Sequence, residues 1–151
     1  MEPEISAILR LLAGTLAGVA LGYPRELADK PIGMRTLALV SLGSATVAVA
    51  ALRQFDLVQH PDAASRVLQG IVQGLMVGVG FIGAGVILRD TSTNRVHGLT
   101  TATTVWIAAA LGIACGLGEW VIALLGLVLA LVILIVLKRF ERHVSPDMER
   151  H

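Results

Sequence analysis

Five long apolar segments constrain the fold of this chain more than any other feature of its sequence. Each is near the roughly 17–25 residues that an α-helix needs to cross a bilayer. The chain holds 55% hydrophobic and 15% charged residues, whereas charged residues make up about 25% of ordinary soluble domains. We therefore predict an all-α polytopic membrane bundle of about five transmembrane helices, and not a soluble enzyme. The segments are Ile5 to Gly22, Thr36 to Leu52, Val67 to Leu88, Leu99 to Cys115 and Trp120 to Leu137.

Prolines and short connections mark the ends of these segments. Pro24 and Pro31 fall between the first and second segments, and Pro61 falls between the second and third, so no proline is expected inside a membrane span. Only residues 116–119 join the last two segments, which predicts a tight antiparallel hairpin. One long buried helix is the alternative there, and Glu119 argues against it.

Lysine and arginine are divided unevenly between the two sides of the predicted bundle. Cytoplasmic loops carry the excess of these residues, so we predict the N-terminus outside and the C-terminus inside. Residues 1–137 then form the transmembrane domain. Residues 138–151 form a short basic cytoplasmic tail, which is expected to contact anionic lipid and not to fold as a separate C-terminal domain. The inner bases are Arg25, Lys30, Arg35, Arg89, Arg95, Lys138, Arg139, Arg142 and Arg150, and the outer ones are Arg10, Arg53 and Arg66.

Regular glycine spacing predicts where helices approach one another closely. Glycine recurs every fourth residue in the first and third segments, and such small-residue stripes let helix backbones pack tightly in lipid. We therefore expect these two glycine-rich helices to be central. Residues 78–83 also match the dinucleotide pattern G-x-G-x-x-G, but an apolar span lacks the strand and the acidic residue that this site requires. The residues assigned to helix packing are Gly14, Gly18, Gly22, Gly70, Gly74, Gly78, Gly80, Gly83, Gly85 and Trp106.

Ionisable groups are scarce within the predicted spans. All eleven acidic residues fall outside them, and Arg10 is the only charge inside one. We expect Arg10 to extend toward the membrane interface, with a buried partner as the alternative. The missing carboxylates argue against a cation carrier or a proton relay, whereas a carbonyl-lined filter stays open. No catalytic, cofactor-binding or metal-binding residues are assigned, because the histidines are too scattered for a metal site.

A mixed-charge loop and a threonine cluster are predicted to meet at the inner face. We expect Arg25 or Arg35 to pair with Glu26 or Asp29 and to brace the first hairpin. The threonines at the start of the fourth helix could cap that helix, hydrogen-bond a neighbour or bind an anion, and plain hydration of the loop is the simpler alternative. The candidate functional patch consists of Arg25, Glu26, Lys30, Arg35, Thr36, Thr100 and Thr101.

Three stretches of the sequence together resemble the MgtC/SapB family of bacterial membrane proteins. They are residues 25–36, which contain Lys-Pro-Ile-Gly-Met-Arg-Thr, residues 78–89, and residues 98–106 with their Gly-Leu-Thr-Thr-Ala and tryptophan. The resemblance covers about residues 10 to 118. The chain departs from the family pattern at Pro24, where a Glu-Arg-Glu motif is common, and in a turn that looks inserted around Gln73 and Gly74.

The resemblance implies a multi-pass protein of the bacterial cell inner membrane that is linked to magnesium limitation and, in pathogens, to virulence. It also implies contacts with other membrane proteins, such as the F-type ATP synthase or transport proteins. The net charge of +1 gives no reason to expect a nucleic-acid partner. Magnesium ions are usually held through carboxylates, and the predicted core has none. Our leading hypothesis is a non-enzymatic membrane modulator without a cofactor. A small oligomeric transporter or channel is the alternative, and a homo-oligomer is a further hypothesis.

Overall fold

The fold is a bundle of five helices, each long and apolar enough to cross a membrane, which confirms the predicted fold class. The computed structural model describes residues 3–55, 61–90 and 95–137, so the predicted tail lies outside the described residues. A two-stranded antiparallel ribbon, which pairs Leu88 with His97, is a small addition to the all-α prediction. The elements are α1 (Pro3–Glu26), α2 (Met34–Phe55), α3 (Pro61–Ala84), β1 (Leu88–Asp90), β2 (Arg95–His97), α4 (Leu99–Leu117), α5 (Trp120–Val132) and a π-helical turn (Ile133–Leu137).

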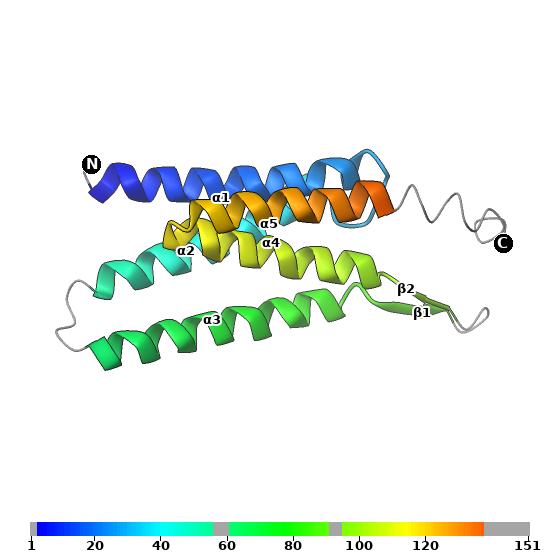
Figure 1. Cartoon of the computed structure of the whole chain (residues 1–151). Helices are drawn as coiled ribbons and strands as arrows, with labels where there is room; N and C mark the ends of the chain where they lie inside the picture. Colours follow the sequence, from blue (N-terminus) through cyan, green and yellow to red (C-terminus); the bar gives the residue numbers. More distant parts are fainter. Residues whose placement is uncertain (1–2, 56–60, 91–94, 138–151) are drawn as a thin grey trace.

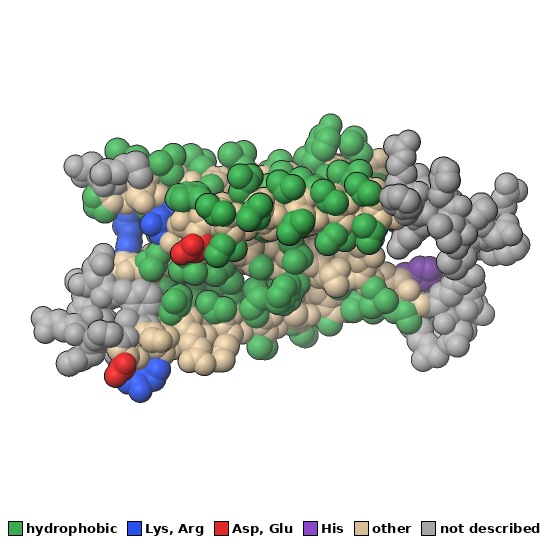
Figure 2. Space-filling view, in the orientation of Figure 1, with side chains coloured by type: hydrophobic (Ala, Val, Ile, Leu, Met, Phe, Trp, Pro, Cys, Tyr) green, Lys and Arg blue, Asp and Glu red, His purple; other side chains and the backbone are tan. Residues whose placement is uncertain are grey.

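The helices run roughly along the long axis of the bundle, and the start of α1 and the end of α5 lie at its opposite ends (Figure 1). We call the end that holds the α1–α2 loop and the β-ribbon the loop end. Figure 2 shows apolar side chains over most of the visible face, whereas charged side chains gather at the end where α1 begins. This distribution is the one that a hydrocarbon layer requires around a helix bundle.

Helix α4 is the centre of the bundle, because it contacts each of the other four helices. Its span is 56% buried, against 11% for α3 and 6% for α5. The prediction that the first and third helices are central is therefore wrong for the third. Helix α1 packs against both α2 and α4, whereas α3 lies along one side of the bundle (Figure 1).

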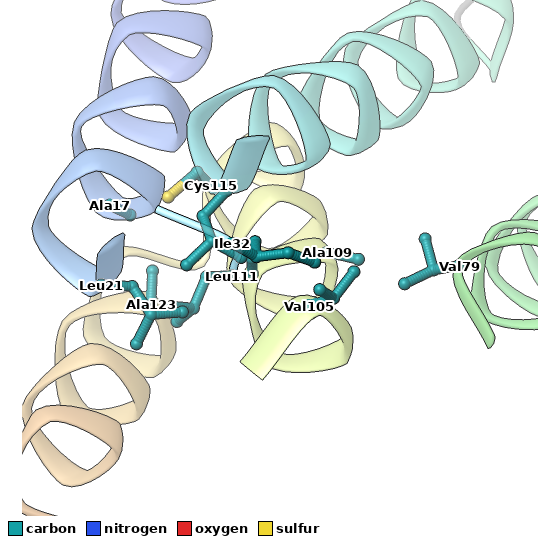
Figure 3. Packing of buried hydrophobic residues seen from close by; sticks show 11 residues of the cluster. Ala17, Leu21, Ile32, Val79, Val105, Ala109, Leu111, Cys115 and Ala123 are labelled. Carbon is teal, nitrogen blue, oxygen red and sulfur yellow. The ribbon is translucent and has the colours of Figure 1, made fainter. Parts of the chain in front are cut away.

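Small and medium side chains fill the core between α1, α2 and α4. Leu21, Leu37 and Val105 have no exposed surface, and alanines from α1 and α4 surround them. In Figure 3, Val79 stands alone on the α3 side of this cluster, and Ala123 reaches it from α5. The outer two helices thus cover the core without contributing much to it.

The first glycine stripe packs directly on α2. A Cβ atom on Gly18 would lie 2.5 Å from the carbonyl oxygen of Leu37, and one on Gly22 would lie 2.5 Å from the Cα of Met34. These contacts leave no room for a side chain, so the two backbones touch. On α4, Gly112 and Gly116 meet the α2 backbone in the same way.

The second glycine stripe does not pack within this chain. A Cβ atom on Gly70, Gly74, Gly78 or Gly80 would meet nothing within 4 Å. Their predicted role in packing is therefore not fulfilled between the described helices. Gly83 does approach the α4 backbone, Gly85 approaches only the end of its own helix, and Trp106 is 47% exposed on α4.

The predicted limits of the first and third segments are wrong, and α3 already begins at Pro61 instead of Val67. Helix α1 continues through Pro24 to Glu26, because a proline in the last turn removes one hydrogen bond and its φ angle suits a helix. Helix α3 ends at Ala84, and the chain tightens there through a hydrogen bond from the Val86 amide to the Gly83 carbonyl. β-Branched Val86 and Ile87 then lead into the ribbon.

The turn between α4 and α5 confirms the predicted hairpin. Gly118 has φ +85°, a conformation that costs glycine little. The Gly118 amide donates to the Cys115 carbonyl and the Glu119 amide to the Ala114 carbonyl. This pair of bonds is a Schellman motif, which ends α4 and turns the chain directly into α5.

Candidate functional site

Arg25 lies at the loop end of the bundle and is only 5% exposed. Its Nε donates to the Ile32 carbonyl at 3.0 Å, its Nη2 to Thr101 Oγ1 at 2.6 Å and its Nη1 to Thr104 Oγ1 at 3.3 Å. One side chain thereby joins α1, the α1–α2 loop and the start of α4. We call these four residues the Arg25 clasp.

Local sequence explains how the clasp forms. The continuation of α1 past Pro24 keeps Arg25 on the helix face that looks into the bundle. Thr101 and Thr104 are three residues apart on α4, so their hydroxyls share a face. The Thr104 hydroxyl donates to the Thr100 carbonyl at 2.6 Å, which leaves its oxygen free to accept from Arg25.

Glu26 organises the same loop in a different way. Its Oε2 accepts a hydrogen bond from the Met34 amide at 3.0 Å. This bond satisfies one of the unpaired amides at the start of α2, and a carboxylate there also suits the helix dipole. A Cβ atom on Gly33 would overlap Glu26 Oε2, so a larger residue at this position would displace the Glu26 carboxylate from this contact.

The predicted pairing of Arg25 or Arg35 with Glu26 or Asp29 is wrong among the described residues. The ion pair found there joins Arg53 and Glu4 at 2.9 Å, at the opposite end of the bundle. Arg25 points inward, where the acceptors are neutral oxygens, whereas the adjacent Glu26 is exposed. The negative end of the α1 dipole also favours a cation at this position.

The structure places the predicted patch residues in two layers. Arg25 and Thr101 are buried in the clasp, and Glu26 is exposed although it is bonded to the start of α2. The remaining members are exposed at the same end of the bundle: Lys30, Arg35, Thr36 and Thr100. Because Arg25 binds both Ile32 and Thr101, the loop and the start of α4 are held together beneath these side chains.

Sequence reasoning missed three members of this region: Ile32, Gly33 and Thr104 as a partner of Arg25. The spacing of Thr101 and Thr104 was visible in the sequence. The burial of Ile32, at 6% exposed, was not, because a single apolar residue in a charged loop carries no periodic signal.

Arg10 forms a matching contact at the other end of α4. Its Nη1 donates to the Gly116 carbonyl at 2.9 Å, and its Nε lies 3.3 Å from Ser6 Oγ. Arg10 thus has a part-buried partner at the end of α4, as the alternative prediction proposed. The last carbonyls of a helix are unpaired and carry its negative dipole end, so they attract a cation.

The clasp positions hydrogen-bond donors and a charge, and its polar groups are already bonded to one another. Within the described segments, no three His, Cys, Asp or Glu side chains gather as a metal site would require. What this arrangement can do is hold a charged loop rigidly against the start of a central helix.

Comparison with known proteins gives consistent matches over most of the chain. A family model described as the MgtC family matches residues 11–143. Protein SrpB of Synechococcus elongatus is 40% identical over 139 residues, which cover 88% of this chain and 75% of SrpB. Protein MgtC of Salmonella typhimurium is 36% identical over 138 residues, which cover 91% of this chain and 55% of that protein.

Protein SapB of Bacillus subtilis is 33% identical over 150 residues, which cover 97% of this chain and 62% of SapB. The chain thus spans three quarters of SrpB but less than two thirds of these MgtC and SapB proteins. No solved structure matches it significantly.

Proposed function

This chain belongs to the MgtC family, and we propose that it is a non-enzymatic modulator of the bacterial inner membrane that acts by contacting other membrane proteins. The observation that supports this proposal is the Arg25 clasp. Its hydrogen bonds hold the loop end together, and such a fixed arrangement suits a preformed recognition surface. Binding to such a surface costs little ordering entropy because its backbone is already fixed.

The exposed layer above the clasp is the surface that we assign to partner contacts. Lys30 and Arg35 supply positive charge, and the hydroxyls of Thr36 and Thr100 can donate or accept hydrogen bonds. This chemistry suits an acidic loop of a partner at the membrane surface, where charge complementarity raises the rate and the specificity of association.

Family resemblance extends this proposal to physiology. We propose that the protein supports growth at limiting magnesium, and that it is linked to virulence where the bacterium that carries it is a pathogen. Partners of the kind expected are the F-type ATP synthase and transport proteins. The described core offers few carboxylates to a magnesium ion, which favours an indirect role over transport.

Substitutions of two exposed residues test the proposed surface. Arg35→Ala and Thr100→Val should leave the membrane level of the protein unchanged but reduce growth at low magnesium and the yield of cross-linked partners in native membranes. Thr103→Val is the matched control, because Thr103 is also exposed at the start of α4 but its hydroxyl bonds to the carbonyls of its own helix. Normal growth and unchanged cross-links for both test variants would refute the proposal.

The alternative, a small oligomeric transporter or channel, makes a different prediction. Purified protein in liposomes would then carry a solute or ion across the bilayer without any partner. Flux above that of protein-free liposomes would replace the modulator proposal with the transport one.

A further inference from the structure

A stripe of polar side chains runs along the outward face of α3. Asp62, Arg66, Gln69 and Gln73 follow one another at intervals of four, three and four residues, and all four are exposed. This spacing keeps them on one side of a helix. Figure 2 shows acidic and basic side chains at the N-terminal end of α3. The face therefore differs in chemistry from the apolar surface of α5, whose exposed side chains are mainly leucine, isoleucine and valine.

The stripe extends from the end of α3 to its middle. Gln73 lies near the centre of a helix that runs from Pro61 to Ala84 and is apolar enough to span a bilayer. Neither its amide nor that of Gln69 has a side-chain hydrogen bond to another described residue. Hydrocarbon offers no donor or acceptor to such a group, so a polar amide at this depth needs a protein partner.

The stripe is complementary to itself. Asp62 and Arg66 carry opposite charges one turn apart, and they form no ion pair with each other in the described part of the chain. A glutamine amide both donates and accepts, so two copies of Gln73 can bond to one another. A two-fold axis along the bilayer normal would set α3 of one copy parallel to α3 of the next, because all copies insert in the same orientation.

We propose that a second copy of this chain covers the stripe, so that the protein forms a two-fold homodimer through α3. In this arrangement Asp62 of each copy meets Arg66 of the other, since four residues rise only about 6 Å along a helix and an arginine spans that height. Gln69 and Gln73 then pair across the axis. Gly70 and Gly74 are open and lie beside the stripe, so they allow the close approach but do not by themselves identify the partner.

Charge reversal tests the pairing directly. Self-association is measured by energy transfer between labelled copies of the full chain in lipid vesicles, as protein is diluted with lipid. Asp62→Arg and Arg66→Asp should each weaken it about tenfold, since a 1.4 kcal/mol loss of pairing corresponds to that factor. The double variant Asp62→Arg/Arg66→Asp should regain wild-type association. A mixture of the two single variants should form heterodimers.

The mixture keeps the test valid if a single variant folds poorly alone, because complementary charges are restored only between copies. Gln73→Leu should also weaken association, whereas Thr46→Val, an exposed change on α2 that removes a bond within its own helix, should not. Wild-type energy transfer no higher than that expected for randomly distributed copies, or failure of the double variant and of the mixture to restore transfer, would overturn the dimer. A stoichiometry above two would instead favour a pore lined by the stripe and would also overturn it.

The dimer proposal stands apart from the proposed function. Its test measures contacts between copies of this chain in pure lipid, where no other membrane protein is present. Loss of the dimer with normal growth at low magnesium would leave the modulator proposal intact. A normal dimer with lost growth in the Arg35 and Thr100 variants would leave the dimer proposal intact.

Discussion

At the scale of single residues, Arg25 is held by neutral oxygens alone. A buried charge is costly unless it is fully hydrogen-bonded. Arg25 meets this demand with one carbonyl and two hydroxyls, supplied by the loop and by α4. The clasp therefore depends on threonine at position 101, whose oxygen makes the shortest of the three bonds.

Thr101→Val is predicted to destabilise the protein by about 1–3 kcal/mol, because it removes an acceptor from a buried charged group while keeping the side-chain volume. Thr103→Val should change stability little, because Thr103 is exposed and bonds only to its own helix. Unfolding of each variant in detergent, followed by circular dichroism against denaturant, measures the difference. Equal stability of the two variants would mean that Thr101 does not hold Arg25.

At the scale of the elements, two glycine stripes of equal spacing have different surroundings. The α1 stripe faces the backbone of α2, with Leu37 and Ala38 in direct contact with Gly18. The α3 stripe faces outward. A stripe of small residues therefore allows close packing but does not determine whether a helix of the same chain lies opposite it.

Gly18→Ala should destabilise the bundle by about 1–3 kcal/mol, because the new methyl group forces α1 away from α2. Gly43→Ala is the matched control on α2, where a Cβ atom would meet nothing within 4 Å. It should be neutral or stabilising by up to about 1 kcal/mol, since alanine favours a helix over glycine. The midpoint of thermal unfolding in detergent micelles compares the two. A Gly18→Ala variant as stable as the control would contradict direct backbone contact.

At the scale of the whole molecule, the start of α1 and the end of α5 lie at opposite ends of a bundle of five helices that are long and apolar enough to cross a membrane (Figure 1). The structure shows which groups share an end: the Arg25 clasp, the β-ribbon and the end of α5 lie together at the loop end (Figure 1). Which end faces the cytoplasm depends on the distribution of lysine and arginine, and this distribution predicts that the loop end is inside.

Reporter fusions measure this orientation. A reporter that is active only in the periplasm should work when it is fused after Arg53 and fail when it is fused after Lys138. A cytoplasmic reporter at the same two positions is the control and should give the opposite pattern. Periplasmic activity after Lys138 with none after Arg53 would invert the topology and place the clasp on the outer side.

The sequence by itself determined the number of helices, their approximate ends and the α4–α5 hairpin. Each of these follows from local chemistry, because an apolar segment in hydrocarbon must satisfy its own backbone hydrogen bonds and so becomes a helix. The turn at Gly118 is equally local. The boundary at Pro24 was wrong because a proline near the end of a helix only weakens the last turn, and tertiary contacts of Arg25 outweigh that loss.

Only the tertiary structure decided which helix is central and which oxygens hold Arg10 and Arg25. These outcomes depend on the relative rotation and depth of segments that are distant in the chain, such as Arg25 and Thr104, and no local pattern encodes them. The same reason explains the two glycine stripes: their spacing is identical, but α1 lies against the backbone of α2, whereas the stripe on α3 has no described helix in contact with it.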